Sequence, residues 1–184
     1  SQELHVMHMT DVKSKINIIG ILGILGAILM IICVFLEWGS IEMALMGESG
    51  TYAFSGWDLY SDVSIFSIPL LDFSIPISEL ELTSYSYVPL VALICGIVGL
   101  IATILPVASS GSKNNNRIFG IIALILAIVS VVLMVLYMTD LSYSGGYEGL
   151  ATATVGASYG VYIGIVGAVL MILGGIGDIA RKTE

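Results

Sequence analysis

Basic residues are scarce in this chain of 184 residues, which has six lysines and arginines against fourteen aspartates and glutamates. All six basic residues lie in three short polar segments: Lys13, Lys15, Lys113, Arg117, Arg181 and Lys182. Residues 37–87 and 139–158 carry ten acids and no base. Such a polyanionic region excludes nucleic acid as a partner, and the basic segments are too short to form a nucleic-acid-binding domain.

Cysteine and histidine are also scarce, with two residues of each. The only cysteines, Cys33 and Cys95, fall inside apolar runs, so no disulfide stabilises the segments between the runs. Their expected depths differ by about 5 Å, which favours two free buried thiols over a bridge that helix tilt would have to permit. Both histidines lie in residues 1–8, which we interpret as a cloning remnant because Met9 makes a natural start. The runs therefore contain no histidine for haem, and we expect no cofactor.

Charge is also missing from four long apolar runs, over residues 16–36, 88–107, 118–138 and about 159–179, which contain no Asp, Glu, Lys, Arg or His except Asp178 at the edge of the last. Each run has about 20 residues, enough for a helix to cross a hydrocarbon core of about 30 Å. We predict transmembrane helices over residues 16–37, 88–108, 118–138 and 159–179. The first exceeds the apolar region of a signal peptide and precedes no small-residue cleavage site, so we expect it to be retained.

The basic residues orient these helices, because lysine and arginine collect in cytoplasmic segments. They predict an integral protein of the plasma membrane with both termini in the cytoplasm. The cytoplasmic segments are then 1–15, 109–117 and 180–184, and the outer segments are 38–87 and 139–158.

Within the runs, the polar residues are too few and too mild for catalysis. Thr103 and Ser130 are expected to bond to the preceding turns of their own helices. Proton-coupled transport relies on ionisable residues at membrane depth, and these runs offer no nucleophile, base and orienting group. We therefore predict a protein that is not an enzyme, with no catalytic and no cofactor-binding residue.

Small residues recur at intervals of four toward the end of the chain, at Gly156, Gly160, Gly164 and Ala168. Such a stripe lets helix backbones approach closely, either inside one bundle or between copies in a homo-oligomer or a larger membrane complex. The run 118–138 has one glycine and is the most aliphatic, so we expect it to be the most exposed to lipid. Gly-Ile-Val-Gly occurs at both 96–99 and 164–167, as two related hairpins would require.

The outer segments alternate like half-buried strands. Residues 41–45 and 52–54 place apolar side chains on one face around an expected turn at 47–50, and residues 71–82 and 151–155 add further strands. The predicted fold is an all-α transmembrane four-helix bundle with a small extracellular antiparallel β-sheet built mainly from the first outer segment. Tryptophan and tyrosine favour the membrane interface, and we interpret a set of them as an interfacial belt: Trp38, Tyr85, Tyr87, Tyr137 and Tyr159.

Trp38 just beyond the first helix and the later pair Gly56-Trp57 resemble the W and GxW elements of the claudin and peripheral myelin protein tetraspan superfamily. The leucine within the superfamily's GLW motif and the two cysteines that follow it are absent here. The resemblance implies an outer sheet of four strands joined by a fifth from the second outer segment. Prokaryotic four-helix membrane proteins of uncharacterised function show a comparable tryptophan before a glycine-rich strand region, and membership of such a family stays open.

The resemblance implies a non-enzymatic structural, adhesion or accessory-subunit role through lateral or external contacts, with Trp38 and Trp57 anchoring the sheet to the outer leaflet. The acids outside leave a cation-selective pore or passive transport component as one alternative. External divalent-cation binding by Asp58, Asp62 and Asp72 is another, although their spacing matches no recognised loop. The lipid bilayer is the one partner that the composition itself predicts.

Overall fold

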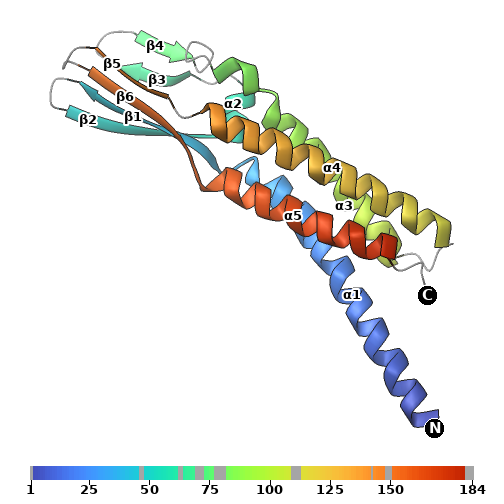
Figure 1. Ribbon diagram of the computed structural model, residues 1–184. Helices are drawn as coiled ribbons and strands as arrows, with labels where there is room; N and C mark the ends of the chain where they lie inside the picture. Colours follow the sequence, from blue (N-terminus) through green and yellow to red (C-terminus); the bar gives the residue numbers. More distant parts are fainter. Residues whose placement is uncertain are drawn as a thin grey trace.

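Four long helices dominate the computed structural model, which describes residues 2–45, 48–61, 64–68, 73–76, 82–108, 113–141, 143–147 and 151–180. They lie side by side in Figure 1: α1 (Gln2–Cys33), α3 (Val88–Ala108), α4 (Lys113–Asp140) and α5 (Tyr159–Ala180). In this described part, α3, α5 and residues 117–140 of α4 are long and apolar enough to cross a membrane. The corresponding apolar part of α1, Ile18–Cys33, is shorter.

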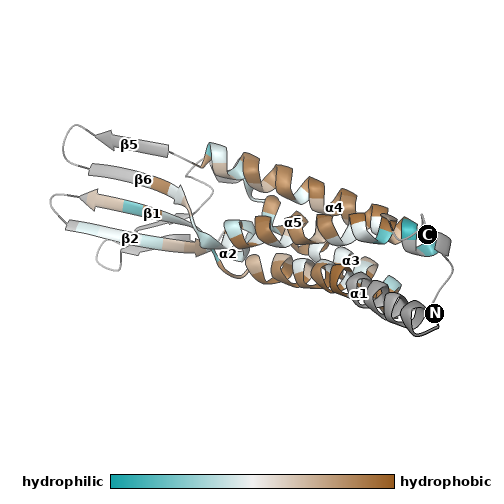
Figure 2. Cartoon of the chain, turned by 60° about the horizontal axis from the view of Figure 1, so that its bottom comes forward, coloured by the Kyte–Doolittle hydropathy of each residue, from teal (hydrophilic) through white to brown (hydrophobic). Residues whose placement is uncertain are grey.

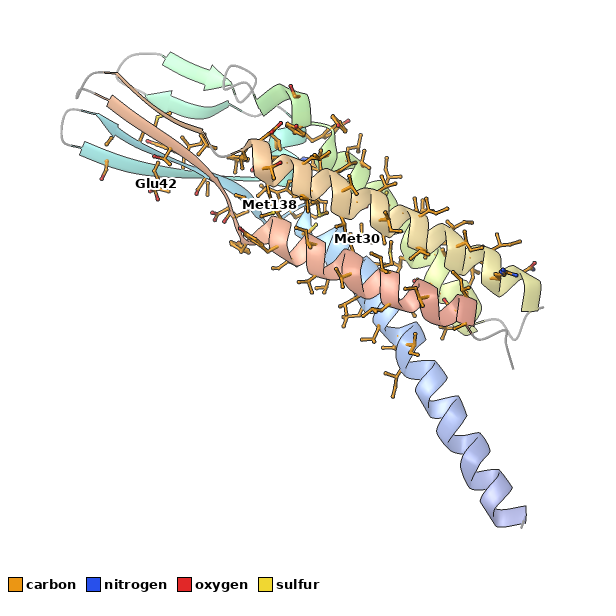
Figure 3. All side chains as sticks on the ribbon, viewed as in Figure 1. Met30, Glu42 and Met138 are labelled. Carbon is orange, nitrogen blue, oxygen red and sulfur yellow. The ribbon has the colours of Figure 1, made fainter. Side chains whose placement is uncertain are left out.

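The four helices form a ring in which α1 and α4 each pack against both α3 and α5. Alanine, methionine and cysteine fill the centre: Ala27, Met30, Cys95, Ala102, Ala123, Ala127, Ala168 and Met171. Figure 3 shows Met30 among the helices. In the apolar part of α4 28% of the residues are buried, against 44% in α3 and 39% in α5, which agrees with the prediction that this run is the most exposed.

A four-stranded antiparallel sheet continues the bundle at one end, which we call the sheet-side end (Figure 1). Its order across the described strands is β2 (Glu48–Ser55), β1 (Glu37–Leu45), β6 (Ala151–Ala157) and β5 (Tyr143–Tyr147). A separate hairpin pairs β3 (Ser64–Ile68) with β4 (Phe73–Pro76). The predicted antiparallel sheet is confirmed, but the four-stranded sheet takes two strands from each segment between helices. The first segment still supplies the two longer strands, β1 and β2, together with the β3–β4 hairpin.

The faces of this sheet follow the alternation of the sequence. Ile41 is paired with Tyr52 and Val155 on one face, and the buried Ile41 and Val155 contribute to the core beneath it. On the opposite face, Glu42 lies between Thr51 and Thr154, and all three are exposed. Figure 3 shows Glu42 pointing away from the molecule, and Figure 2 shows the hydrophobic colours concentrated on the helices.

Several boundaries differ from the sequence prediction, although α3 has the predicted bounds. The first helix ends at Cys33 rather than at 37, and the chain turns there before β1. Helix α4 begins at Lys113, so the second half of the expected loop over 109–117 is helical. The expected turn over 47–50 is likewise short, because β2 begins at Glu48.

Predictions about polar groups inside the helices are confirmed. The hydroxyl of Thr103 donates to the carbonyl of Gly99 at 2.9 Å, and that of Ser130 donates to Leu126 at 2.9 Å. Both cysteines are free and buried. These groups satisfy their hydrogen-bonding needs within the helices that carry them, as an apolar environment requires.

Candidate functional site

The two motif elements described above, Trp38 and the pair Gly56-Trp57, meet where α1 ends. An α-helix leaves its last four carbonyl groups without partners in the helix, and leaving them unsatisfied in apolar surroundings is costly. Here the indole Nε1 of Trp38 donates to the carbonyl oxygen of Cys33 at 2.7 Å. The backbone N–H of Trp57 donates to the carbonyl oxygen of Val34 at 2.9 Å. Both tryptophans therefore help to cap α1 from later parts of the chain.

Gly56 brings these parts together by close contact. It begins the short helix α2 (Gly56–Ser61), which lies at the junction of bundle and sheet (Figure 1). A Cβ atom on Gly56 would lie 2.8 Å from two ring atoms of Trp38, Cε2 and Nε1, and 2.9 Å from the carbonyl oxygen of Val34. Side chains do not approach so closely, so the junction requires glycine at this position.

Ser55 and Asp58 fix the start of α2 through a reciprocal cap. The carboxylate Oδ2 of Asp58 accepts from the backbone N–H of Ser55 at 2.9 Å and from its hydroxyl at 2.8 Å. The N–H of Asp58 donates back to the Ser55 hydroxyl at 3.1 Å. This is the capping-box arrangement, with aspartate in place of the usual glutamate, and its Ser-x-x-Asp spacing is visible in the sequence.

The cap gives Asp58 a structural role. Asp62 and Asp72, the other members of the predicted divalent-cation set, lie outside the described residues. Among the residues that are described, no three His, Cys, Asp or Glu side chains gather as ligands of a metal ion would. The carboxylate of Asp58 is already occupied by its contacts with Ser55.

Trp38 lies in the core, with 0% of its side chain exposed. Its ring packs against Tyr137, also fully buried, with ring centroids 5.3 Å apart. The carbonyl oxygen of Trp38 accepts from the Tyr137 hydroxyl at 3.4 Å and from the N–H of Ser158 at 3.0 Å. The interpretation of Trp38 and Tyr137 as members of an interfacial belt is therefore wrong, because both side chains are buried in the core between the bundle and the sheet.

Tyr85 extends this aromatic cluster toward the surface. Its ring meets that of Tyr137 edge-on at 6.4 Å between centroids. Its hydroxyl donates to the carboxylate of Asp140, the last residue of α4. This hydrogen bond, with smaller contributions from desolvation and from the charge of Asp140, raises the pKa of Tyr85 above its ordinary value. The pair ties the segment before α3 to the end of α4.

Trp57, in contrast, presents its ring to the outside, with 43% of the residue exposed. The ring stacks against Phe35 at 6.0 Å and 29° between planes, and it meets Tyr60 at 5.6 Å. Phe35 and Tyr60 are also exposed. The resemblance implies one shared role for the two tryptophans, and the structure places them in different environments.

The predicted stripe of small residues faces the interior. Gly156 lies on β6 rather than in the helix, and a Cβ there would meet nothing within 4 Å. On α5, a Cβ at Gly160 would lie 2.5 Å from the carbonyl oxygen of Glu37, and one at Gly164 would lie 2.8 Å from the sulfur of Cys33. Ala168 is fully buried. The three helical members therefore pack within this chain, against the end of α1 and its neighbours.

The sequence matches no protein-family model, and no curated protein matches it. Inferences about its role therefore start from the arrangement of its own residues.

Proposed function

We propose that the chain is an integral protein of the plasma membrane in which α1, α3, α4 and α5 all span the bilayer. Both termini face the cytoplasm, and the four-stranded sheet stands outside the cell. The protein has a non-enzymatic structural, adhesion or accessory-subunit role, exercised through lateral or external protein contacts.

The observation that carries this proposal is a single antiparallel pairing that runs from the bundle into the sheet. In the sheet, β1 pairs with β6 from Gly39 opposite Ala157 to Leu45 opposite Ala151. In the bundle, α1 and α5 touch backbone to backbone, since a Cβ on Gly26 would lie 2.6 Å from the amide nitrogen of Met171. Because α1 leads into β1 and β6 leads into α5, the sheet is held in a fixed orientation on the bundle. A surface used for recognition benefits from such rigid support.

The junction at the end of α1 supports the proposed resemblance to the claudin and peripheral myelin protein superfamily. Trp38 and Gly56-Trp57 are the residues that match its motif, and they meet at the point where bundle and sheet join. The sheet departs from the expected pattern because the second segment supplies two strands instead of one. Both the meeting of these motif residues and the different source of the strands are consistent with a relationship in overall architecture.

The apolar centre of the bundle argues against a pore through one molecule. The described residues at this centre are alanine, methionine and cysteine, and they pack closely. A cation path would therefore have to form between molecules or along the acidic outer segments. Flux of Na⁺ into vesicles containing the protein would support that alternative over the structural role.

The proposed topology can be tested with single cysteines, because the native Cys33 and Cys95 are buried. Thr154→Cys places a thiol on the exposed sheet face, and Arg117→Cys places one at the exposed start of α4's apolar part. In intact cells, a membrane-impermeant maleimide should label the first variant and should label the second only after permeabilisation. Labelling of both in intact cells, or of neither after permeabilisation, would contradict the topology.

The proposed role can be tested with a photo-crosslinking amino acid at Thr154 in native membranes. Discrete protein adducts, with this chain or another, are expected from the sheet face. The matched control carries the same group at Ile125, which is exposed on α4 and should react mainly with lipid. Absence of protein adducts at Thr154, together with Na⁺ flux in purified vesicles, would overturn the structural role in favour of transport.

A further inference from the structure

An exposed apolar stripe runs along α1 and ends at Phe35. Its members recur at intervals of three or four residues on one helix face: Ile21, Leu25, Ile28 and Ile32. Phe35 lies three residues beyond Ile32 and is itself 57% exposed. The stripe therefore continues past the last helical residue onto the turn before β1, and it stops where Trp57 stacks on the Phe35 ring.

The exposure of Trp57 is built into the fold. Its backbone N–H is held by Val34, Gly56 before it is packed on Trp38, and the Ser55–Asp58 cap sets the start of α2. This arrangement aims the indole and the ring of Tyr60 outward from a fixed helix. Tryptophan and tyrosine combine an apolar ring with a polar tip, which suits them to the boundary between headgroups and hydrocarbon.

Helices α3 and α5 have exposed aromatic rings at the same end. Tyr87 precedes the first residue of α3, and Tyr159 and Tyr162 lie in the first turn of α5; all three are exposed. A helix crosses a hydrocarbon core in about 20 residues. Counted inward from Phe35 and from Tyr159, that length reaches Lys15 on α1 and Ile179 on α5. Lys15 is basic, and in the sequence Arg181 and Lys182 follow α5, which agrees with cytoplasmic ends.

We propose that these exposed rings form a girdle at the outer boundary of the bilayer, with α2 lying among the lipid headgroups: Phe35, Trp57, Tyr60, Tyr87, Tyr159 and Tyr162. The occupant of this surface is the headgroup–acyl boundary of a zwitterionic bilayer. The two outer segments and their flanks carry ten acids and no base, so anionic lipid has no charge to bind there. This inference rests on the proposed membrane topology. It goes further by naming the residues that lie at the outer boundary of the bilayer.

The test uses the two tryptophans as internal probes. The full-length protein is reconstituted into phosphatidylcholine vesicles whose acyl chains carry bromine, a quencher of tryptophan fluorescence, either near the headgroup or near the bilayer centre. Headgroup-proximal bromine should quench the wild type about twofold more than central bromine, because Trp57 sits at the interface. Trp57→Phe should abolish this difference, because the remaining Trp38 is buried in protein.

Failure of this inference is distinguishable from failure of the topology. Equal quenching by the two lipids, or a depth preference that persists in Trp57→Phe, would overturn the girdle while the protein stays resistant to extraction by alkaline carbonate. Extraction of the whole protein by carbonate would overturn both the girdle and the membrane topology. Trp57→Tyr supplies a further check, since it should keep the reconstitution yield of the wild type while removing the depth-dependent signal.

Discussion

Trp38 and Trp57 belong to the same junction but lie on opposite sides of it. Trp38 is fully buried, donates its indole N–H to the end of α1, and packs against Tyr137. Trp57 contributes its backbone N–H to the same helix end, while its ring stays exposed beside Phe35. One tryptophan stabilises with its side chain, and the other is fixed by its backbone so that its side chain is free to meet the surroundings.

The difference shows that residue type alone does not decide the environment of an aromatic ring. Tryptophan suits a buried core as well as an interface, because its large apolar ring carries a single donor that needs one partner. The packing of Gly56 against the Trp38 ring separates the two environments. Substitutions at this junction should therefore affect stability very unequally.

The largest effect is expected from Trp38→Ala. It removes a large, fully buried side chain and a donor to the carbonyl of Cys33, and such truncations cost about 3–5 kcal/mol. Thermal unfolding in mild detergent, followed by circular dichroism, should show a marked fall in melting temperature.

Trp57→Ala is the matched control for this substitution. It leaves the backbone bond to Val34 in place, so stability in detergent should change by only about 0.5 kcal/mol. Comparable losses in the two variants would erase the proposed distinction between the tryptophans.

Gly56→Ala should have the next largest effect. The added methyl would meet the Trp38 ring and the carbonyl oxygen of Val34, and overpacking of this kind costs about 1–3 kcal/mol. Gly156→Ala serves as the control, because its added methyl would meet nothing within 4 Å. Melting temperatures should fall for the first variant alone; an unaffected Gly56→Ala would mean that α2 does not rest on Trp38 as described.

Ser55→Ala should be milder. It removes the hydroxyl that accepts from the N–H of Asp58 and donates to its carboxylate, and loss of a helix N-cap costs about 1 kcal/mol. Ser61→Ala, at the exposed other end of α2, is the control and should change little. Limited proteolysis should cleave near α2 faster in Ser55→Ala, and equal rates in both variants would argue against the cap.

The smallest effect is expected at Tyr85, at the outer edge of the Trp38 cluster. Its hydrogen bond to Asp140 raises its pKa, so the folded state favours the protonated phenol. The resulting stability is fully present below the ordinary tyrosine pKa of about 10 and is lost as the pH rises through the higher folded pKa. Tyr85→Phe should therefore be less stable than the wild type at neutral pH, and the difference should shrink above pH 10. A difference that is constant across this range would contradict the bond; Tyr87→Phe is the control.

Much of the fold was accessible from the sequence because long apolar runs and strict alternation are strong signals. The bounds of α3 and the strand at 151–155 follow directly from them. The contribution of β5 was missed because its sequence, Tyr-Ser-Gly-Gly-Tyr, interrupts the alternation with two glycines. Pairing with β6, the next strand along the chain, places it in the sheet.

The sequence identified the residues of the site but not the environments of their side chains. The pattern of Trp38 and Gly56-Trp57 marked the right residues. Ser55-x-x-Asp58 carries a capping signal in its spacing, whereas from the sequence Asp58 is considered only as an alternative ligand of a divalent cation. The opposite environments of the tryptophans depend on the end of α1, which lies four residues before its predicted boundary. The apolar sequence continues past Cys33, so composition does not reveal where the helix stops and the tertiary caps begin.

The pairing of α1–β1 with β6–α5 has a consequence for the order in which the molecule is made. A ribosome releases α1 first, and two partners on the far side of this pairing, α5 for α1 and β6 for β1, are produced only near the end of synthesis. Contacts between such distant segments form late and slowly. During synthesis, the surface of α1 that packs against α5 must therefore stay without this partner until α5 closes the ring.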